Sequence, residues 1–170
     1  MTIIADKDRP AVRDLLAREL VEDVELLLFT RGRSYPFESG RQDGQSCAET
    51  RELLEELEKL SDQLHLTIHD VDAEPAAATL YNVTALPTVI VRRRPNATEA
   101  AQDDASAHSA PGEIGANVRF LGLPGGYEFS TLLADVVDIS KGRTDLSAGA
   151  LDVVRAIDTP VHVQVFVTPT

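Results

Sequence analysis

The chain has 170 residues and a formal net charge of −12. A polyanion of this kind repels nucleic acid and acidic membrane surfaces, so we expect neither as a partner. Hydrophobic residues make up 43% and charged residues 26%, which is ordinary for a globular domain with a real core. The sequence has no apolar run of membrane-span length, no signal-peptide core and one cysteine. These features predict a cytoplasmic protein without an internal disulfide.

The first two elements are a helix and a strand. Asp8-Arg9-Pro10 opens the helix, with Pro10 in the first turn, where its missing N–H costs nothing. Val24–Thr30 is short and almost entirely apolar. Such a run is typical of a strand that is covered on both faces, as parallel sheets require. The apolar face of the helix is predicted to consist of Val12, Leu15, Leu16 and Leu20.

A loop with glycine and proline breakers follows, from Arg31 to Gln45. It carries Arg31, Arg33 and Arg41, and is slightly basic within an acidic protein. These arginines could hold an anion or an acidic peptide. The simpler interpretation, which we favour, is a solvated loop.

The single cysteine lies where the next helix is expected to begin. Ser46 and Glu49 have the spacing of a capping box, which places Cys47 on the first helical turn. A helix N-terminus favours a thiolate, so a reactive Cys47 is one hypothesis. A buried and inert cysteine is the alternative. The helix buries a stripe of leucines at spacings of three and four: Leu53, Leu54, Leu57 and Leu60.

Leu64–Asp70 alternates strictly and predicts a strand with one apolar face. His65 and His69 fall on its polar face. Two histidines alone do not make a metal site, and we expect none. A short helix over Glu74–Tyr81 follows, and Pro87 then stands directly before a β-branched strand that runs to Val91.

Residues 92–112 are nearly devoid of large apolar side chains, which predicts a long mobile connection. Asn117–Leu121 is the next expected strand, and Tyr127–Ser140 the next helix, which Gly142 ends. That helix is predicted to bury Phe129, Leu132, Leu133, Val136 and Val137.

The last residues repeat the pattern of the first. Ser147 can cap a helix, and Val161–Thr168 reads as a strand rich in valine. We therefore divide the chain into a domain over 1–145, with a mobile insert at 93–113, and a helix and strand over 146–170 that begin a second, incomplete unit. An unpaired strand invites pairing with another chain, so a homodimer through 161–167 is one expectation.

Several phrases of this sequence resemble the glutaredoxin-like protein disulfide oxidoreductases. That family has two tandem thioredoxin-fold units, each usually with a Cys-x-x-Cys motif. The resemblance extends over nearly the whole chain except the insert, and the two-unit N-terminal domain of alkyl hydroperoxide reductase flavoproteins looks like a more distant relative. The phrases that carry it are Thr50–Leu57, Asp70-Val71-Asp72, Leu86-Pro87-Thr88, Val118–Phe129, Ile157-Asp158 and Val165–Thr170.

The resemblance implies an α/β thioredoxin-like fold: a central mixed sheet with helices on both faces, plus an extra helix and strand at the C-terminus. It also implies a site. In Gly44-Gln45-Ser46-Cys47, Cys47 matches the resolving cysteine of the motif and Gly44 replaces the nucleophilic one. Pro87 matches the proline that thioredoxin folds hold in cis, within a binding groove made by Leu86, Pro87, Thr88 and Ser46. A cis bond there leaves the preceding backbone free to pair with an extended substrate.

Thiol–disulfide exchange with two thiols cannot close within a chain that has one cysteine. The resemblance therefore implies, at most, monothiol exchange at Cys47 with a protein thiol, a disulfide or a peptide partner. Whether the chain is an enzyme is left open, and we expect no cofactor. The alternative is a non-catalytic thioredoxin-fold module that binds or assembles proteins.

Overall fold

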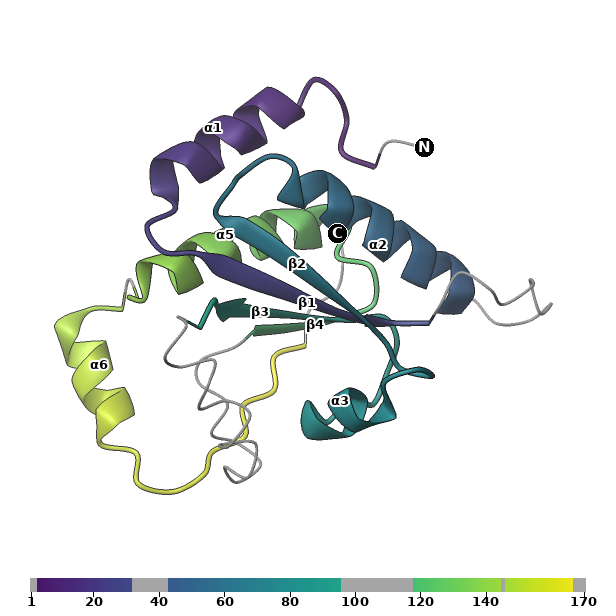
Figure 1. The fold of residues 1–170 in the computed structure, drawn as a ribbon. Coiled ribbons are helices and arrows are strands. Elements are labelled where there is room, and N and C mark those ends of the chain that lie inside the picture. Colours follow the sequence, from purple (N-terminus) through teal and green to yellow (C-terminus); the bar gives the residue numbers. More distant parts are fainter. Residues whose placement is uncertain (1–2, 32–42, 96–117, 145, 167–170) are drawn as a thin grey trace.

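The computed structural model describes residues 3–31, 43–95, 118–144 and 146–166. Its strands belong to one four-stranded sheet in the order β2-β1-β3-β4 (Figure 1). In chain order the elements are α1 (Arg9–Glu19), β1 (Val24–Thr30), α2 (Asp43–Glu58), β2 (Leu64–Asp70), α3 (Pro75–Leu80), β3 (Thr88–Arg93), β4 (Val118–Leu121), α5 (Tyr127–Lys141) and α6 (Ala148–Arg155).

The sheet is mixed, as predicted. β1 lies parallel to β2 and antiparallel to β3, and β4 is antiparallel to β3. Leu28 stands opposite Ile68 on one side and Val89 on the other. Because β1 is flanked by strands on both sides, its backbone is paired along its whole length, and six of its seven residues are buried.

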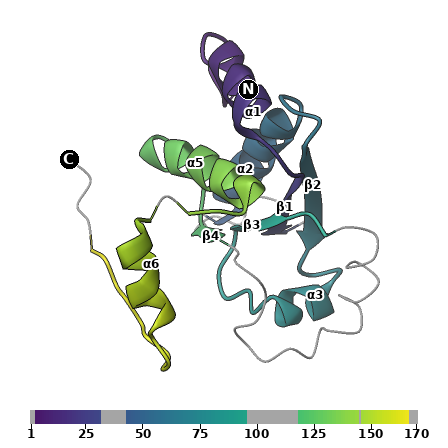
Figure 2. The same cartoon turned by 90° about the vertical axis from the view of Figure 1, so that its left-hand side faces the viewer.

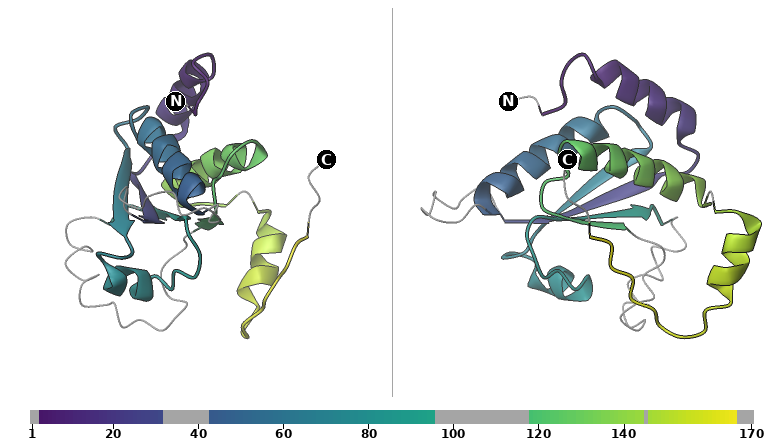
Figure 3. Two further views of the ribbon diagram at one scale, coloured as in Figure 1. Left: turned by 90° about the vertical axis from the view of Figure 1, so that its right-hand side faces the viewer. Right: turned by 180° about the vertical axis from the view of Figure 1, so that it is seen from behind.

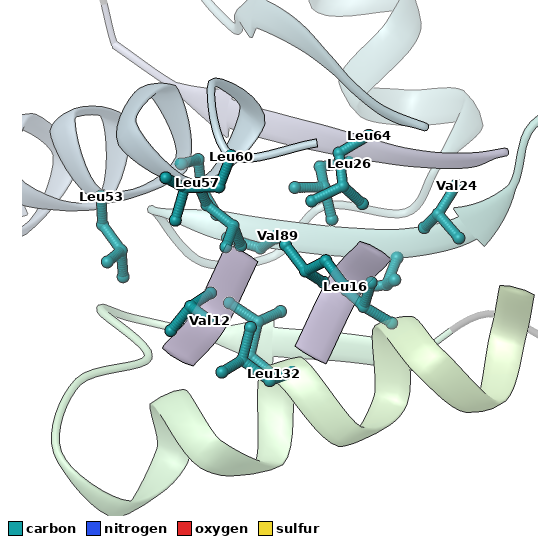
Figure 4. Close-up of a cluster of buried hydrophobic side chains, with 14 of the residues drawn as sticks. Val12, Leu16, Val24, Leu26, Leu53, Leu57, Leu60, Leu64, Val89 and Leu132 are labelled. Atoms are coloured by element: carbon teal, nitrogen blue, oxygen red, sulfur yellow. The ribbon is translucent and has the colours of Figure 1, made fainter. Parts of the chain in front are cut away.

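Helices cover both faces of the sheet, with α1, α2 and α5 on one side and α3 on the other (Figure 3). The larger core lies between the three helices and the sheet (Figure 4). The strands contribute every second residue to it, because side chains alternate across a strand. From β1 come Val24, Leu26 and Leu28, and from α1 and its C-cap come Val12, Leu16 and Leu20.

The opposite face has a smaller core beneath α3. Leu27, Phe29 and Ile90 are buried there, and Tyr81 and Leu86 pack against them. α3 has only six residues and none of them is buried. The two cores explain why β1 is apolar at consecutive positions, as the sequence indicated, while β2 alternates: its Leu64, Leu66 and Ile68 contribute to the larger core only.

Two predicted boundaries are wrong. A cap at Ser46 predicts Cys47 as the first helical residue, but α2 begins at Asp43, four residues earlier. Arg93 is the last residue of β3 and not part of the insert, because it pairs with Val24 of β1. Residues 96–113, the rest of that insert, lie outside the described residues.

The end of the chain departs most from the prediction. α6 forms as expected, with the Ser147 Oγ accepting from the Ala150 N–H at 3.2 Å. Residues 161–166, however, form no strand. A strand is stabilised by hydrogen bonds to a neighbour, and none of the described segments lies beside these residues. Figure 2 shows α6 and the segment after it standing apart from the sheet, beyond β4.

None of the helices in the described ranges combines the length and the apolar character that crossing a membrane requires.

Candidate functional site

Cys47 lies on the inner face of α2. It is the fifth residue of that helix, and only 6% of its surface is exposed. Thr50, Leu54 and Leu57 continue the same buried stripe at spacings of three and four. The cysteine is buried because it occupies the helix face that packs on the sheet.

The helix start differs from the predicted capping box. The Ser46 carbonyl accepts a hydrogen bond from the Thr50 hydroxyl at 2.7 Å, and Gln45 donates to Glu49 at 2.8 Å. The four N–H groups that a helix leaves unpaired belong to its first turn, and Cys47 follows that turn. The unpaired N–H groups that were expected to favour a thiolate at Cys47 therefore lie around Gly44 instead.

Gly44 occupies the exposed end of this stripe, one turn before Cys47. A Cβ added at Gly44 would meet nothing within 4 Å. Position 44 can therefore accept an exposed side chain, whereas the side chain at position 47 is buried. Where the resemblance puts a nucleophilic cysteine, this chain leaves an open, solvent-facing backbone.

Pro87 forms the second part of the predicted site. The Leu86–Pro87 peptide bond is cis, which confirms the expectation from the resemblance. The Pro87 carbonyl accepts from the Gly122 N–H at 2.8 Å, and the Thr88 hydroxyl donates to the Ala85 carbonyl at 2.7 Å. Pro87 and Thr88 are buried, so packing as well as these two hydrogen bonds holds the turn in place.

The backbone of Leu86 differs from that of its neighbours. Its side chain packs against Phe29 and Ile90, yet its N–H and C=O have no hydrogen-bond partner within the described part of the chain. Thr88 stands opposite Phe29 in the sheet. The turn thus lies at the carboxyl end of β1, the end from which the chain continues towards α2 (Figure 1).

The two histidines of β2 are engaged separately. His69 Nδ1 lies 2.7 Å from the Glu74 carboxylate, and its ring stacks on Phe29 with centroids 4.9 Å apart. His65 Nε2 lies 3.0 Å from Asp23 Oδ2 and 2.8 Å from Arg94 Nη1. Within the described ranges, no group of three or more His, Cys, Asp or Glu residues could hold a metal ion.

Of the three loop arginines, only Arg31 is described. Its Nε lies 3.5 Å from Asp72 Oδ2, in an exposed ion pair. Arg33 and Arg41 lie outside the described residues, so the anion hypothesis stays a prediction.

Sequence reasoning missed a polar cluster on the α3 face of the sheet. Glu25 accepts from Arg92 Nε and Nη2, both at 2.8 Å, and from the Thr67 hydroxyl at 2.9 Å. Arg92 also lies over the Tyr81 ring, 5.8 Å from its centroid. The cluster joins β1, β2 and β3. Glu25, the only charged residue in an otherwise apolar run, was the available signal.

Comparison with known proteins supports the fold. The chain shares 21% identity and a TM-score of 0.62 with the alkylhydroperoxide reductase protein AhpF from Enterococcus faecalis, over 91% of this chain and 61% of that one. The NTD_N/C domain of the same protein gives 20% identity and a TM-score of 0.60, over 88% and 58%. A protein disulfide oxidoreductase from Aeropyrum pernix gives 19% and 0.62, over 89% and 54%. No family model and no curated protein sequence matches.

The topology and these likenesses define a thioredoxin-like α/β fold, as the sequence resemblance implied. The structural neighbours include the two kinds of protein that the resemblance named. The chain spans between 54% and 61% of the length of the three structures, so the match concerns only part of each.

Proposed function

We propose that the chain is a thioredoxin-fold protein of the disulfide oxidoreductase kind whose present function is to bind an extended protein segment at the Leu86–Pro87 turn. In this proposal Cys47 supplies, at most, slow monothiol chemistry. The observation that carries the proposal is the unpaired backbone of Leu86 beside a turn that is otherwise fixed by hydrogen bonds. An extended peptide that adds its own backbone there would pair both groups.

The chemistry at Cys47 is limited by the missing partner. The Cys47 thiolate would attack a disulfide, form a mixed disulfide with one half and release the other half as a thiolate. A second thiol from solution, such as glutathione, would then have to regenerate Cys47. Because the sulfur is buried, we expect this cycle to be slow. One cysteine also suits a reducing compartment, and we propose a cytoplasmic location.

The second candidate is a binding or assembly module without any thiol chemistry. The burial of Cys47 and the glycine at position 44 favour it. The two candidates share the Leu86–Pro87 surface and differ only in whether Cys47 reacts.

Binding can be tested with a permanently unfolded protein, reduced and carboxymethylated α-lactalbumin, by fluorescence anisotropy. Leu86→Pro removes the Leu86 N–H and should weaken binding about tenfold, which corresponds to a lost backbone hydrogen bond. Thr84→Pro, at an exposed position of the same loop, is the matched control and should bind like the wild type. Equal affinity of all three proteins would contradict the proposal.

A second experiment tests whether positions 44 and 47 can form a redox-active disulfide. Gly44→Cys places a second thiol one helical turn before Cys47, where a side chain fits without a clash. We expect an internal disulfide, seen as a loss of two hydrogens by mass spectrometry, and a gain in the reduction of insulin by dithiothreitol. Gln45→Cys is the matched control, because residues two apart on a helix do not face each other. A folded Gly44→Cys protein that forms no disulfide would refute this part.

A further inference from the structure

α6 and the segment after it carry an apolar surface that the rest of the described chain does not cover. Its six main residues are between 50% and 80% exposed: Val153, Val154, Ile157, Val161, Val163 and Val165. Together they expose roughly 700 Å², close to one partner's share of a standard protein–protein interface. The largest apolar patch on a typical monomer is about 300–600 Å² and is often functional.

The surface has the pattern of two regular elements. Val153 and Val154 lie next to each other on α6, and Ile157 follows the helix end, three residues after Val154 and four after Val153. In the extended segment, Val161, Val163 and Val165 alternate with polar residues, so they share one face. The backbone of residues 161–166 has no hydrogen-bond partner within the described chain. The segment thus has a strand's side-chain pattern but lacks the neighbour that would make it a strand.

We propose that this surface is covered by the same surface of a second copy of the chain. The two segments pair antiparallel about a twofold axis with Val163 on the axis. Val161 of one copy then stands opposite Val165 of the other. This register keeps all valines of both copies on one face, over which the two α6 stripes pack. It makes the contact isologous, the commonest form of symmetric dimer.

Charge favours a second copy at this place. Between Ser147 and Phe166 the charged residues are Asp152, Arg155 and Asp158. With two acidic groups and one basic group, the net charge of this segment is −1, whereas that of the whole protein is −12. Two copies therefore repel each other least when they meet through this surface. Their remaining charge still opposes association, so salt should strengthen the dimer by screening it. This inference is independent of peptide binding at Leu86.

The oligomeric state tests the proposal. We expect the 170-residue protein to sediment as a dimer at high protein concentration, and more completely at high than at low salt. Val163→Asp puts two like charges on the axis and should weaken the dimer by about 100-fold or more. Gln164→Asp, on the opposite face, is the matched control and should leave it intact. Both residues are exposed in the single chain, so both variants should fold. A monomeric wild type, or a dimer that survives Val163→Asp but not Gln164→Asp, would overturn the proposal.

Cross-linking tests the register. In a Cys47→Ser background, Val163→Cys should form a disulfide-linked dimer under mild oxidation, because the two copies of residue 163 meet on the axis. Gln164→Cys in the same background should link far more slowly. The reverse order would contradict the placement of Val163 on the axis, and equal slow rates would contradict antiparallel pairing altogether.

Discussion

The chain contains the same helix–strand pattern twice, with two different outcomes. α1 and β1 are part of the core, where Leu16, Leu26 and Leu28 have no exposed surface. α6 forms as a helix but buries nothing, and residues 161–166 remain an exposed extended segment. Both stretches have apolar residues at the spacing that their element requires, so the pattern alone does not decide burial.

The difference lies in what surrounds each strand. β1 has hydrogen-bonded neighbours on both sides and helices over both faces. The segment at 161–166 has neither within the described residues. The backbone hydrogen bonds of α6 are internal to the helix and Ser147 caps its start, whereas a strand needs a partner for its backbone.

The largest expected contrast is between core substitutions in the two segments. Leu28→Ala removes a side chain packed in the larger core and should lower the free energy of unfolding by about 2–5 kcal/mol. Val163→Ala should change it by less than about 0.5 kcal/mol, because the side chain is exposed in the single chain. Urea denaturation at low protein concentration measures both. A large loss from Val163→Ala would mean that the segment packs within its own chain.

A second contrast concerns two serines whose hydroxyls bond to backbone groups. The Ser140 hydroxyl accepts from the N–H groups of Val21 and Glu22 and donates to the Glu22 carbonyl, so it joins α5 to the connection between α1 and β1. Ser140 is fully buried, and Ser140→Ala should cost about 1–3 kcal/mol, since it leaves backbone groups unpaired. Ser147→Ala removes the α6 cap and should leave global unfolding nearly unchanged.

Amide hydrogen exchange separates the two serine effects. Ser147→Ala should speed exchange in α6 alone, because an exposed helix opens locally. Faster exchange throughout the sheet in this variant would contradict the separation of α6 from the core.

The smallest contrast is electrostatic and depends on pH. Hydrogen bonds from Lys141, then from Arg18, lower the pKa of Glu19 from 4.5 to about 2. A carboxyl whose pKa is lowered by folding stabilises the protein above its unfolded pKa, and this contribution is lost as pH falls from about 4.5 to about 2. Glu19→Gln should therefore lower the melting temperature slightly at pH 7, and the difference should vanish near pH 2.

Asp158→Asn, in the uncovered segment, is the matched control for the Glu19 prediction, because Asp158 is exposed there. Its melting temperature should match the wild type at both pH values. An equal loss in both variants would point to net charge rather than to the Lys141 contact.

Periodicity predicted the elements that satisfy themselves locally or alternate clearly. The consecutive apolar residues of β1 and the alternation of β2 identified which strand is covered on both faces. The start of α2 was missed because the Ser46–Glu49 spacing mimics a capping box, while Thr50 bonds to the Ser46 carbonyl inside the helix. The strand predicted from Val161 to Thr168 is absent over residues 161–166, since β propensity cannot supply a neighbouring strand.

The candidate site divides in the same way. The cis bond before Pro87 followed from the resemblance and is present. The burial of Cys47 agrees with the helical spacing of the leucine stripe, because Cys47 lies seven residues before Leu54 and therefore on the same face of α2. The unpaired backbone of Leu86 agrees with the same resemblance, because the cis proline of this fold leaves the backbone before it free to pair with an extended segment.

The exposure of Cys47 tests the account of the site most directly. We would measure the rate at which iodoacetamide alkylates Cys47 in the native protein and in denaturant, over a range of pH. Because Cys47 is buried, we expect the native thiol to react about tenfold or more slowly than the unfolded one, and mainly when the protein opens. A native thiol that reacts faster than the unfolded one would contradict it, and would instead identify Cys47 as an exposed, activated nucleophile.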